Sequence, residues 1–121
     1  MTSQPARRQH RWRDYRTPSG RRPVKEFLDS LNSTDAAEVV AAMKDLEYNG
    51  LIVARHLRGE IYEVRAHGDR QTFRILFAPE GRRRTILLAL DGFSKKTRKT
   101  PPAKLELAEK RLRDWRARAS Q

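Results

Sequence analysis

The sequence of 121 residues contains no cysteine, which excludes disulfides, thiolate metal sites and a thiol nucleophile. It also contains no long apolar run. Nothing approaches the roughly 18 apolar residues of a membrane-spanning helix, and the first part of the chain holds no apolar signal core. These absences predict a cytoplasmic protein with no membrane partner. His10, His56 and His67 are scattered and no cluster has metal-ligand spacing, so we expect no metal or other cofactor.

Acidic residues are too few to balance the basic ones. Lys and Arg number 27 against 15 Asp and Glu, which gives a formal net charge of +12 at pH 7. This balance predicts a polyanionic partner, and nucleic acid is the default because Lys and Arg bind it by neutralising phosphates. A membrane surface is less favoured, since the one strongly basic helix carries only a narrow apolar stripe.

The length predicts a single domain. Residues 1–9 show no periodic pattern and are interpreted as a flexible basic arm, which leaves residues 10–119 for the domain. Within it, residues 10–16 predict an edge strand and residues 17–20 a turn. Pro23 then opens a short helix. The apolar face of that helix comprises Val24, Phe27, Leu28 and Leu31.

A second helix is predicted to begin at a cap formed by Ser33 or Thr34 and to end at Gly50. Its inward-facing residues are Ala36, Val39, Val40, Met43 and Leu46. The two helices should form a helical hairpin that packs on one face of a sheet.

Three strands follow a connection through residues 51–60, and they are expected at residues 61–66, 72–78 and 84–91. Alternation in the first two strands predicts an antiparallel register that joins their apolar faces. The predicted pairs are Tyr62 with Phe77, Val64 with Ile75, and Ala66 with Phe73. The same logic pairs Phe77 with Ile86 and Ile75 with Leu88, which leaves Asp91 diagonal to Arg74.

The stretch 85–115 predicts a buried strand, a break at Gly92, a cationic loop and a helix that starts at Pro101 and Pro102. The apolar stripe of that helix comprises Leu105, Ala108, Leu112 and Trp115. The expected fold class is therefore α+β. It has a four-stranded, mainly antiparallel sheet, an N-terminal helical hairpin on one face and a C-terminal helix docked beside it.

The predicted register also places Arg65 opposite Arg74, with both side chains projecting from the face away from the core. Two facing guanidiniums repel each other unless an anion lies between them. Together with Lys95 and Lys96 they would surround a groove suited to a phosphate. The alternative is structural, because Glu63 and Asp91 could neutralise the arginines in a surface network.

The run GFSKKTRKTPPAKLELAEKRLRDW, with LRGEIYEVR at residues 57–65 and TFRILF at residues 72–77, resembles the RelE/HigB superfamily of bacterial toxins. The phage-related HigB-like branch is the most similar, over most of the chain from Trp12 to Trp115. The resemblance implies a RelE-like fold and a type II toxin. Such a toxin would be a metal-free endoribonuclease that cleaves messenger RNA on the ribosome, inhibits translation and is neutralised by a helix-turn-helix antitoxin.

Two alternatives stay open. The superfamily also includes gyrase inhibitors of the ParE type, which bind without catalysis. A simple RNA- or ribosome-binding module is the other alternative, because the basic charge alone requires no chemistry.

The resemblance also implies site residues. Glu63 and Arg65 occupy positions where other members place lysines. Arg74 matches a Tyr-Arg pattern in which Phe73 replaces the tyrosine, and Lys95 or Lys96 falls near another functional arginine. The RNA-binding candidates are Arg58, Arg98, Lys99 and Lys104.

Metal-free cleavage of RNA needs a base, donors for the developing charge and an acid. Arg65 is a poor base because its pKa exceeds about 12. The loop 91–101 contains no Tyr or His to act as the acid. Two assignments remain. In one, Glu63 is the base and Lys95 or Lys96 is the acid. In the other, a lysine whose pKa is lowered by neighbouring cations is the base.

Overall fold

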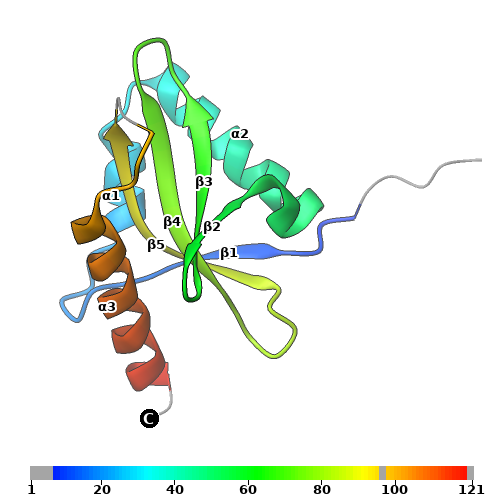
Figure 1. Ribbon diagram of the computed structural model, residues 1–121, viewed down its shortest axis with the longest axis vertical. Coiled ribbons are helices and arrows are strands. Elements are labelled where there is room, and N and C mark those ends of the chain that lie inside the picture. Colours follow the sequence, from blue (N-terminus) through cyan, green and yellow to red (C-terminus); the bar gives the residue numbers. More distant parts are fainter. Residues whose placement is uncertain (1–6, 96–97, 120–121) are drawn as a thin grey trace, which may run out of the picture.

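The structure is a computed structural model that describes residues 7–95 and 98–119. Most of the predicted arm and Lys96 therefore lie outside the described residues. Figure 1 shows the arrangement of the elements. In chain order they are β1 (Arg11–Asp14), α1 (Pro23–Asp29), α2 (Ser33–Asn49), the 3₁₀ helix η1 (Gly50–Val53), β2 (Arg55–Arg58), β3 (Ile61–His67), β4 (Thr72–Glu80), β5 (Ile86–Lys95) and α3 (Pro102–Ala119).

The sheet has five strands in the order β1-β5-β4-β3-β2, so the expected number of four is wrong. β1 is an edge strand, as predicted, and runs parallel to β5, while the other neighbours are antiparallel. The missed strand is β2, which lies in the segment expected to be a connection. It is only four residues long and mostly exposed, so it lacks the alternation that marks a strand in a sequence.

The predicted register between β3 and β4 is confirmed at every pair, including Arg65 opposite Arg74. The predicted register between β4 and β5 is wrong, because Phe77 pairs with Ala89 and Ile75 pairs with Gly92. β5 does not break at Gly92 but continues to Lys95, and an irregularity next to Phe77 shifts the pairing along the strand.

Gly92 is needed for a close contact rather than for a turn. A Cβ atom placed there would lie 2.5 Å from Cδ2 of Phe27, closer than real Cβ contacts allow. Glycine in a strand often marks such an approach by another element. The residue that sequence reasoning used to end the strand therefore lets α1 pack directly on it.

The α1–α2 hairpin covers one face of the sheet, as predicted. Asn32 caps α2 in place of Ser33 or Thr34, because its side-chain oxygen accepts a hydrogen bond from the backbone N–H of Asp35. Gly50 follows the helix with a φ of 73°, in the left-handed region that favours glycine. Val40 was expected to face inward but is 49% exposed. The buried residues of this layer include Val39, Met43, Leu46, Phe73, Ile75 and Phe77.

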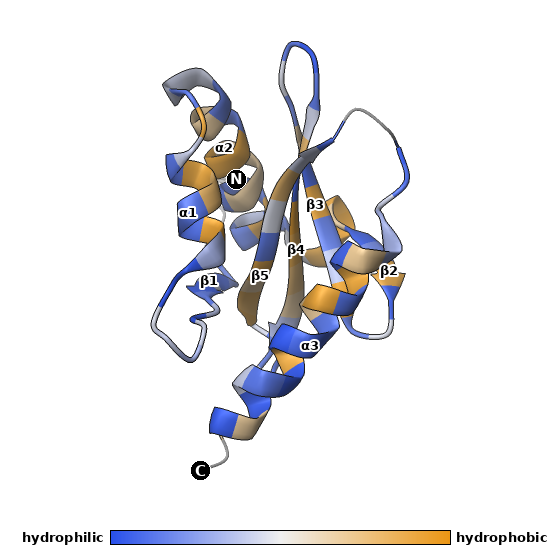
Figure 2. Ribbon diagram, turned by 90° about the vertical axis from the view of Figure 1, so that its left-hand side faces the viewer, coloured by the Kyte–Doolittle hydropathy of each residue, from blue (hydrophilic) through white to orange (hydrophobic). Residues whose placement is uncertain are grey.

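The second face of the sheet is covered by α3, so the molecule has three layers with the sheet in the middle (Figure 2). The helix lies over the sheet rather than beside it. Its predicted stripe does face the strands, and it buries a second cluster that includes Leu76, Leu88, Leu90, Phe93, Ala108 and Leu112. In the part of the chain that the structure describes, no helix is both long and apolar enough to cross a bilayer.

Candidate functional site

A charged cluster lies buried between the sheet and the start of α3. It joins Glu63 of β3, Arg74 of β4 and Thr100, which comes just before the helix. The Thr100 hydroxyl donates to Oε2 of Glu63 and accepts a hydrogen bond of 3.1 Å from Nη1 of Arg74. Nη1 of Arg74 also lies 3.8 Å from Oε2 of Glu63, and both side chains are 0% exposed. The cluster thus ties the segment before α3 to two central strands.

Arg65 extends this cluster toward the surface. Its Nε donates to Oε1 of Glu63 at 2.5 Å, and its Nη2 donates to the backbone carbonyl of Arg98 at 2.7 Å. The Arg65 side chain remains 25% exposed. One guanidinium therefore connects a buried carboxylate with the backbone of the cationic loop.

The expectation that Arg74 projects into an open groove is wrong. The face that carries it is covered by α3 and by the residues that precede the helix, a layer that strand alternation does not reveal. Burial lowers the pKa of Arg74, although the nearby Glu63 carboxylate opposes that shift. Glu63 lies between the two facing arginines and supplies the negative charge that their opposition requires.

Asp91 does not take part in this cluster, in contrast to the surface network considered from the sequence. Its carboxylate lies 3.3 Å from Nη1 of Arg111 and 3.4 Å from Nζ of Lys104, both on α3. Lys104 also stands over the ring of Phe93, with 5.1 Å from Nζ to the ring centroid. These contacts hold the N-terminal half of α3 against β5.

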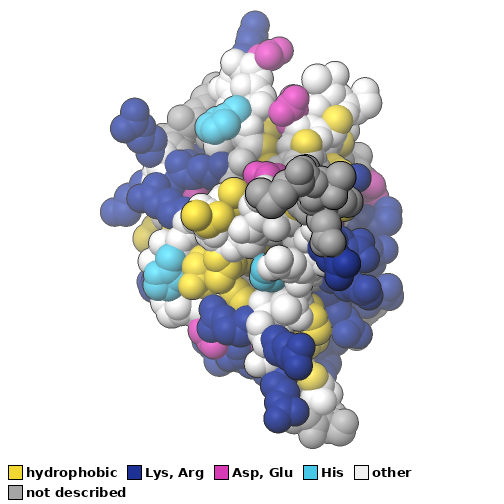
Figure 3. All heavy atoms as spheres, turned by 90° about the vertical axis from the view of Figure 1, so that its right-hand side faces the viewer, with side chains coloured by type: hydrophobic (Ala, Val, Ile, Leu, Met, Phe, Trp, Pro, Cys, Tyr) yellow, Lys and Arg dark blue, Asp and Glu magenta, His cyan; other side chains and the backbone are white. Residues whose placement is uncertain are grey.

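The predicted cations fall into two groups. Lys95, Arg98 and Lys99 lie in the same loop region, and the last two are exposed. Within the described chain none of these three side chains is paired with a carboxylate. Arg58, by contrast, is held 2.5 Å from the Glu109 carboxylate of α3. On the face shown in Figure 3, Lys and Arg side chains clearly outnumber Asp and Glu.

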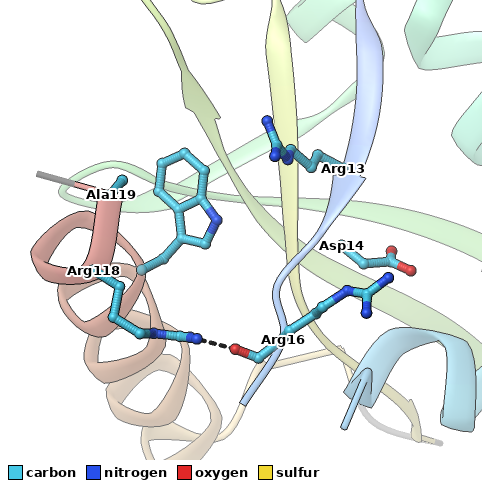
Figure 4. A pocket seen from close by; sticks show the side chains of 6 residues that line it. Arg13, Asp14, Arg16, Arg118 and Ala119 are labelled. Carbon is cyan, nitrogen blue, oxygen red and sulfur yellow. Dashed lines mark hydrogen bonds between the residues drawn. The ribbon is translucent and has the colours of Figure 1, made fainter. Parts of the chain in front are cut away.

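A second cationic site lies near the other end of α3. A cavity of about 300 Å³ lies between β1 and the last turns of the helix, and Figure 4 shows the side chains that line it. The guanidinium of Arg118 donates to the backbone carbonyl of Arg16 and to Asp114, so it holds the helix end against the segment after β1. These bonds anchor the helix, and the cavity contains none of the predicted site residues.

Comparison with known proteins assigns the chain to a family. Residues 26–113 match the family model described as "Phage derived protein Gp49-like (DUF891)". The chain belongs to this Gp49-like family. It is also 33% identical over 108 residues to "Probable endoribonuclease HigB1" of Mycobacterium tuberculosis, in strains CDC 1551 / Oshkosh and ATCC 25618 / H37Rv. The matched region covers 87% of this chain and 84% of those relatives. The predicted resemblance to HigB-like toxins is confirmed.

Sequence reasoning missed Thr100 of this Gp49-like chain. Its two hydrogen-bond partners lie 26 and 37 residues away, and both were assigned to an open face. Threonine carries no local pattern that would indicate such a role. Only the position of the preceding segment over the sheet brings its hydroxyl between Glu63 and Arg74.

Proposed function

We propose that this protein is the toxin of a type II toxin–antitoxin pair and that it cleaves messenger RNA on the ribosome. Its partner would be a separate helix-turn-helix antitoxin, and both would act in the cytoplasm. The similarity to a probable endoribonuclease supports the activity class. The observation that carries the proposal is the loop after β5, whose described cations Arg98 and Lys99 have no carboxylate partner among the described residues and whose backbone is tied to a buried ionic cluster.

In metal-free cleavage the ribose 2′-oxygen forms a bond to phosphorus and the bond from phosphorus to the 5′-oxygen breaks. The products are a 2′,3′-cyclic phosphate and a 5′-hydroxyl. One group removes the proton from the 2′-hydroxyl and another returns a proton to the 5′-oxygen. Nearby cations stabilise the charge that develops on the phosphate oxygens.

The geometry favours a lysine over Glu63 for the first proton transfer. Both Glu63 oxygens accept hydrogen bonds and the side chain is fully buried, so an RNA hydroxyl cannot reach it. We assign proton transfer to Lys95, with Lys96 as the second candidate beyond the described residues. Arg98 and Lys99 would bind the phosphate.

The remaining predicted residues would position the loop or bind flanking phosphates. Glu63 and Arg74 hold the loop in place, and Arg65 links them to the backbone of Arg98. Lys104, beside the loop, and Arg58, across α3, would contact flanking phosphates. Both already have a carboxylate neighbour, so their contribution to RNA binding should be smaller.

The decisive experiment is in vitro translation with the purified protein, followed by mapping of RNA 5′ ends. The Lys95→Met variant should lower the cleavage rate about a hundredfold or more, the range typical of a lost acid or base. Lys44→Met is the matched control, because Lys44 is exposed on α2 away from the loop. Intact messages together with loss of supercoiling by purified gyrase would replace the nuclease with the ParE-like alternative.

A non-catalytic RNA-binding module is the second candidate. It is favoured by the lack of any Tyr or His in the loop 91–101, which leaves only lysines for both proton transfers. This candidate predicts ribosome or RNA binding by the purified protein without new RNA 5′ ends. It also predicts that Lys95→Met changes the affinity for RNA and that no cleavage is detected with either protein.

A further inference from the structure

A groove of about 600 Å³ lies beside Lys95, between α1, the end of β5 and the start of α3. β1 pairs with β5 only from Ile86 to Ala89, so the later residues of β5 have no strand on that side among the described residues. The groove occupies this open side of β5. Its walls include Phe27, Leu31, Phe93 and Pro101, and Lys95 and Lys104 stand at its rim.

The contact between Gly92 and Phe27 shapes the groove. Because Gly92 has no side chain, the Phe27 ring lies directly against the β5 backbone. Phe27 and Leu31 remain only half-buried although they pack on the core. The fold therefore leaves an apolar surface open to solvent within reach of a candidate catalytic lysine.

The rim supplies polar groups of two kinds. Lys104 is held in place by Asp91 at 3.4 Å and by the Phe93 ring, so its ammonium group has a fixed position. The Ser30 hydroxyl donates to the Phe27 carbonyl at 2.6 Å, which leaves its oxygen free to accept a further hydrogen bond. Ser94 is exposed at the opposite edge.

We propose that this groove binds one unstacked nucleobase of single-stranded RNA, next to the phosphate that is cut. This proposal rests on the proposed function and names a substrate subsite for it. Apolar and aromatic walls suit the flat face of a base, and the serine hydroxyls suit its polar edge. Lys95 and Lys104 suit the adjoining phosphates, and the groove volume lies in the range of small-ligand sites. The base held there would influence which sequences are cleaved.

Binding of nucleoside monophosphates tests the subsite without any cleavage. The four 5′-monophosphates and ribose 5-phosphate are titrated into the protein while backbone amide signals are followed by NMR. We expect shifts at Leu31, Ser94 and the neighbouring β5 residues, and at least one nucleotide should bind about tenfold or more tightly than ribose 5-phosphate. Equal affinity for ribose 5-phosphate would reduce the groove to a phosphate site and overturn the proposal. So would the absence of shifts with all four nucleotides.

A blocking variant provides the second measurement. Ser94→Trp should fill the groove, weaken nucleotide binding at least tenfold and change the bases found at mapped cleavage sites. Ser19→Trp is the matched control in an exposed turn and should bind as the native protein does. Ser30→Trp blocks the opposite edge and serves if Ser94→Trp lowers the melting temperature.

The two proposals can fail separately. If RNA is cut but the Ser94→Trp and Ser30→Trp variants keep the native base preference and nucleotide affinity, the groove proposal fails and the nuclease stands. If nucleotides bind in the groove but RNA stays intact, the proposed function fails and the subsite stands. Protection of the groove by a protein partner, with no effect of nucleotides, would overturn the nucleobase assignment.

Discussion

The hydroxyl of Thr100 bridges Arg74 and Glu63, accepting from Nη1 of the arginine and donating to Oε2 of the glutamate. An arginine can only donate hydrogen bonds and an ionised carboxylate can only accept them, so the bridging group must do both. A threonine or serine hydroxyl meets this requirement, whereas a methyl group does not. This hydroxyl thus links the segment before α3 to the sheet, in addition to the bond from Arg65 to the backbone carbonyl of Arg98.

Replacing Thr100 tests this bridge. Thr100→Val keeps the shape of the side chain but removes one hydrogen bond from each of two buried charged groups, which should cost about 1–3 kcal/mol in the free energy of unfolding. Thr100→Ser keeps the hydroxyl and should recover most of that loss. Urea denaturation measures both values. A valine variant as stable as the native protein would contradict the bridging role.

Loss of Glu63 should lower the stability of the fold, whether or not Glu63 takes part in cleavage. Glu63→Gln removes the carboxylate that pairs with Arg74, and loss of one partner from a buried ion pair costs about 3–5 kcal/mol. The control is Glu109→Gln, which weakens the exposed pair with Arg58 and should cost far less because solvent screens that pair. Circular dichroism at increasing urea compares the two. A stable Glu63→Gln protein that binds RNA normally but does not cut it would instead restore Glu63 as the base.

The sequence predicted those parts of the fold that depend on local periodicity. The β3–β4 register follows from alternating apolar residues in both strands, and it placed Arg65 opposite Arg74 correctly. The β4–β5 register could not be predicted in the same way. Whether Gly92 ends a strand or lets another element approach depends on Phe27, which lies in a distant helix.

The candidate site, like the fold, could be predicted only in part. The sequence located the cationic loop and brought Glu63, Arg65 and Arg74 onto neighbouring strands. It could not show that α3 covers them, because polar residues at the positions of Glu63, Arg65 and Arg74 are also what a solvent-facing side of an antiparallel strand carries. The burial of Arg74 and the role of Thr100 both follow from that cover.

Gly92→Ala should destabilise the fold although it adds only a methyl group. The new Cβ would lie 2.5 Å from Phe27 and 3.1 Å from Cδ1 of Ile75, so α1 would have to move away from β5. Overpacking of this kind typically costs about 1–3 kcal/mol. Thermal denaturation should show a lower melting temperature than for the native protein, because the Phe27 ring lies directly against the strand. The double variant Gly92→Ala, Phe27→Leu should then regain part of the loss.

Glu60 should make stability depend on pH in the acidic range. The hydrogen bond from Arg116 lowers the pKa of Glu60, although partial burial opposes the shift. The ion pair therefore stabilises the folded state above the usual pKa of Glu, and this contribution is lost as the pH falls through the lowered value. Both side chains are more than one-third exposed, so the effect should stay below about 1 kcal/mol.

The measurement is the difference in melting temperature between the native protein and Glu60→Gln from pH 7 to pH 3. We expect the native protein to be more stable at pH 7 and the two to converge at the acidic end. Glu38→Gln is the control, because Glu38 is exposed and has no ion pair within the described residues. A difference that grows as the pH falls would contradict the assigned direction.

The loop cations should determine how RNA affinity responds to salt. Each phosphate contact on single-stranded RNA makes the logarithm of the binding constant fall by about 0.7 per unit of the logarithm of salt concentration. Arg98 and Lys99 are exposed and make no described ion pair, so each is free to bind a phosphate. Arg98→Ala and Lys99→Ala should therefore each reduce the slope by about one contact, and the double variant by about two. Lys44→Ala, on the helix α2, should leave the slope unchanged.

Fluorescence anisotropy with a non-cleavable 2′-O-methyl oligonucleotide at several salt concentrations gives the slopes. Identical slopes for the native protein and the double variant would show that the loop is merely solvated, since a cation that binds no phosphate releases no counterion when RNA binds.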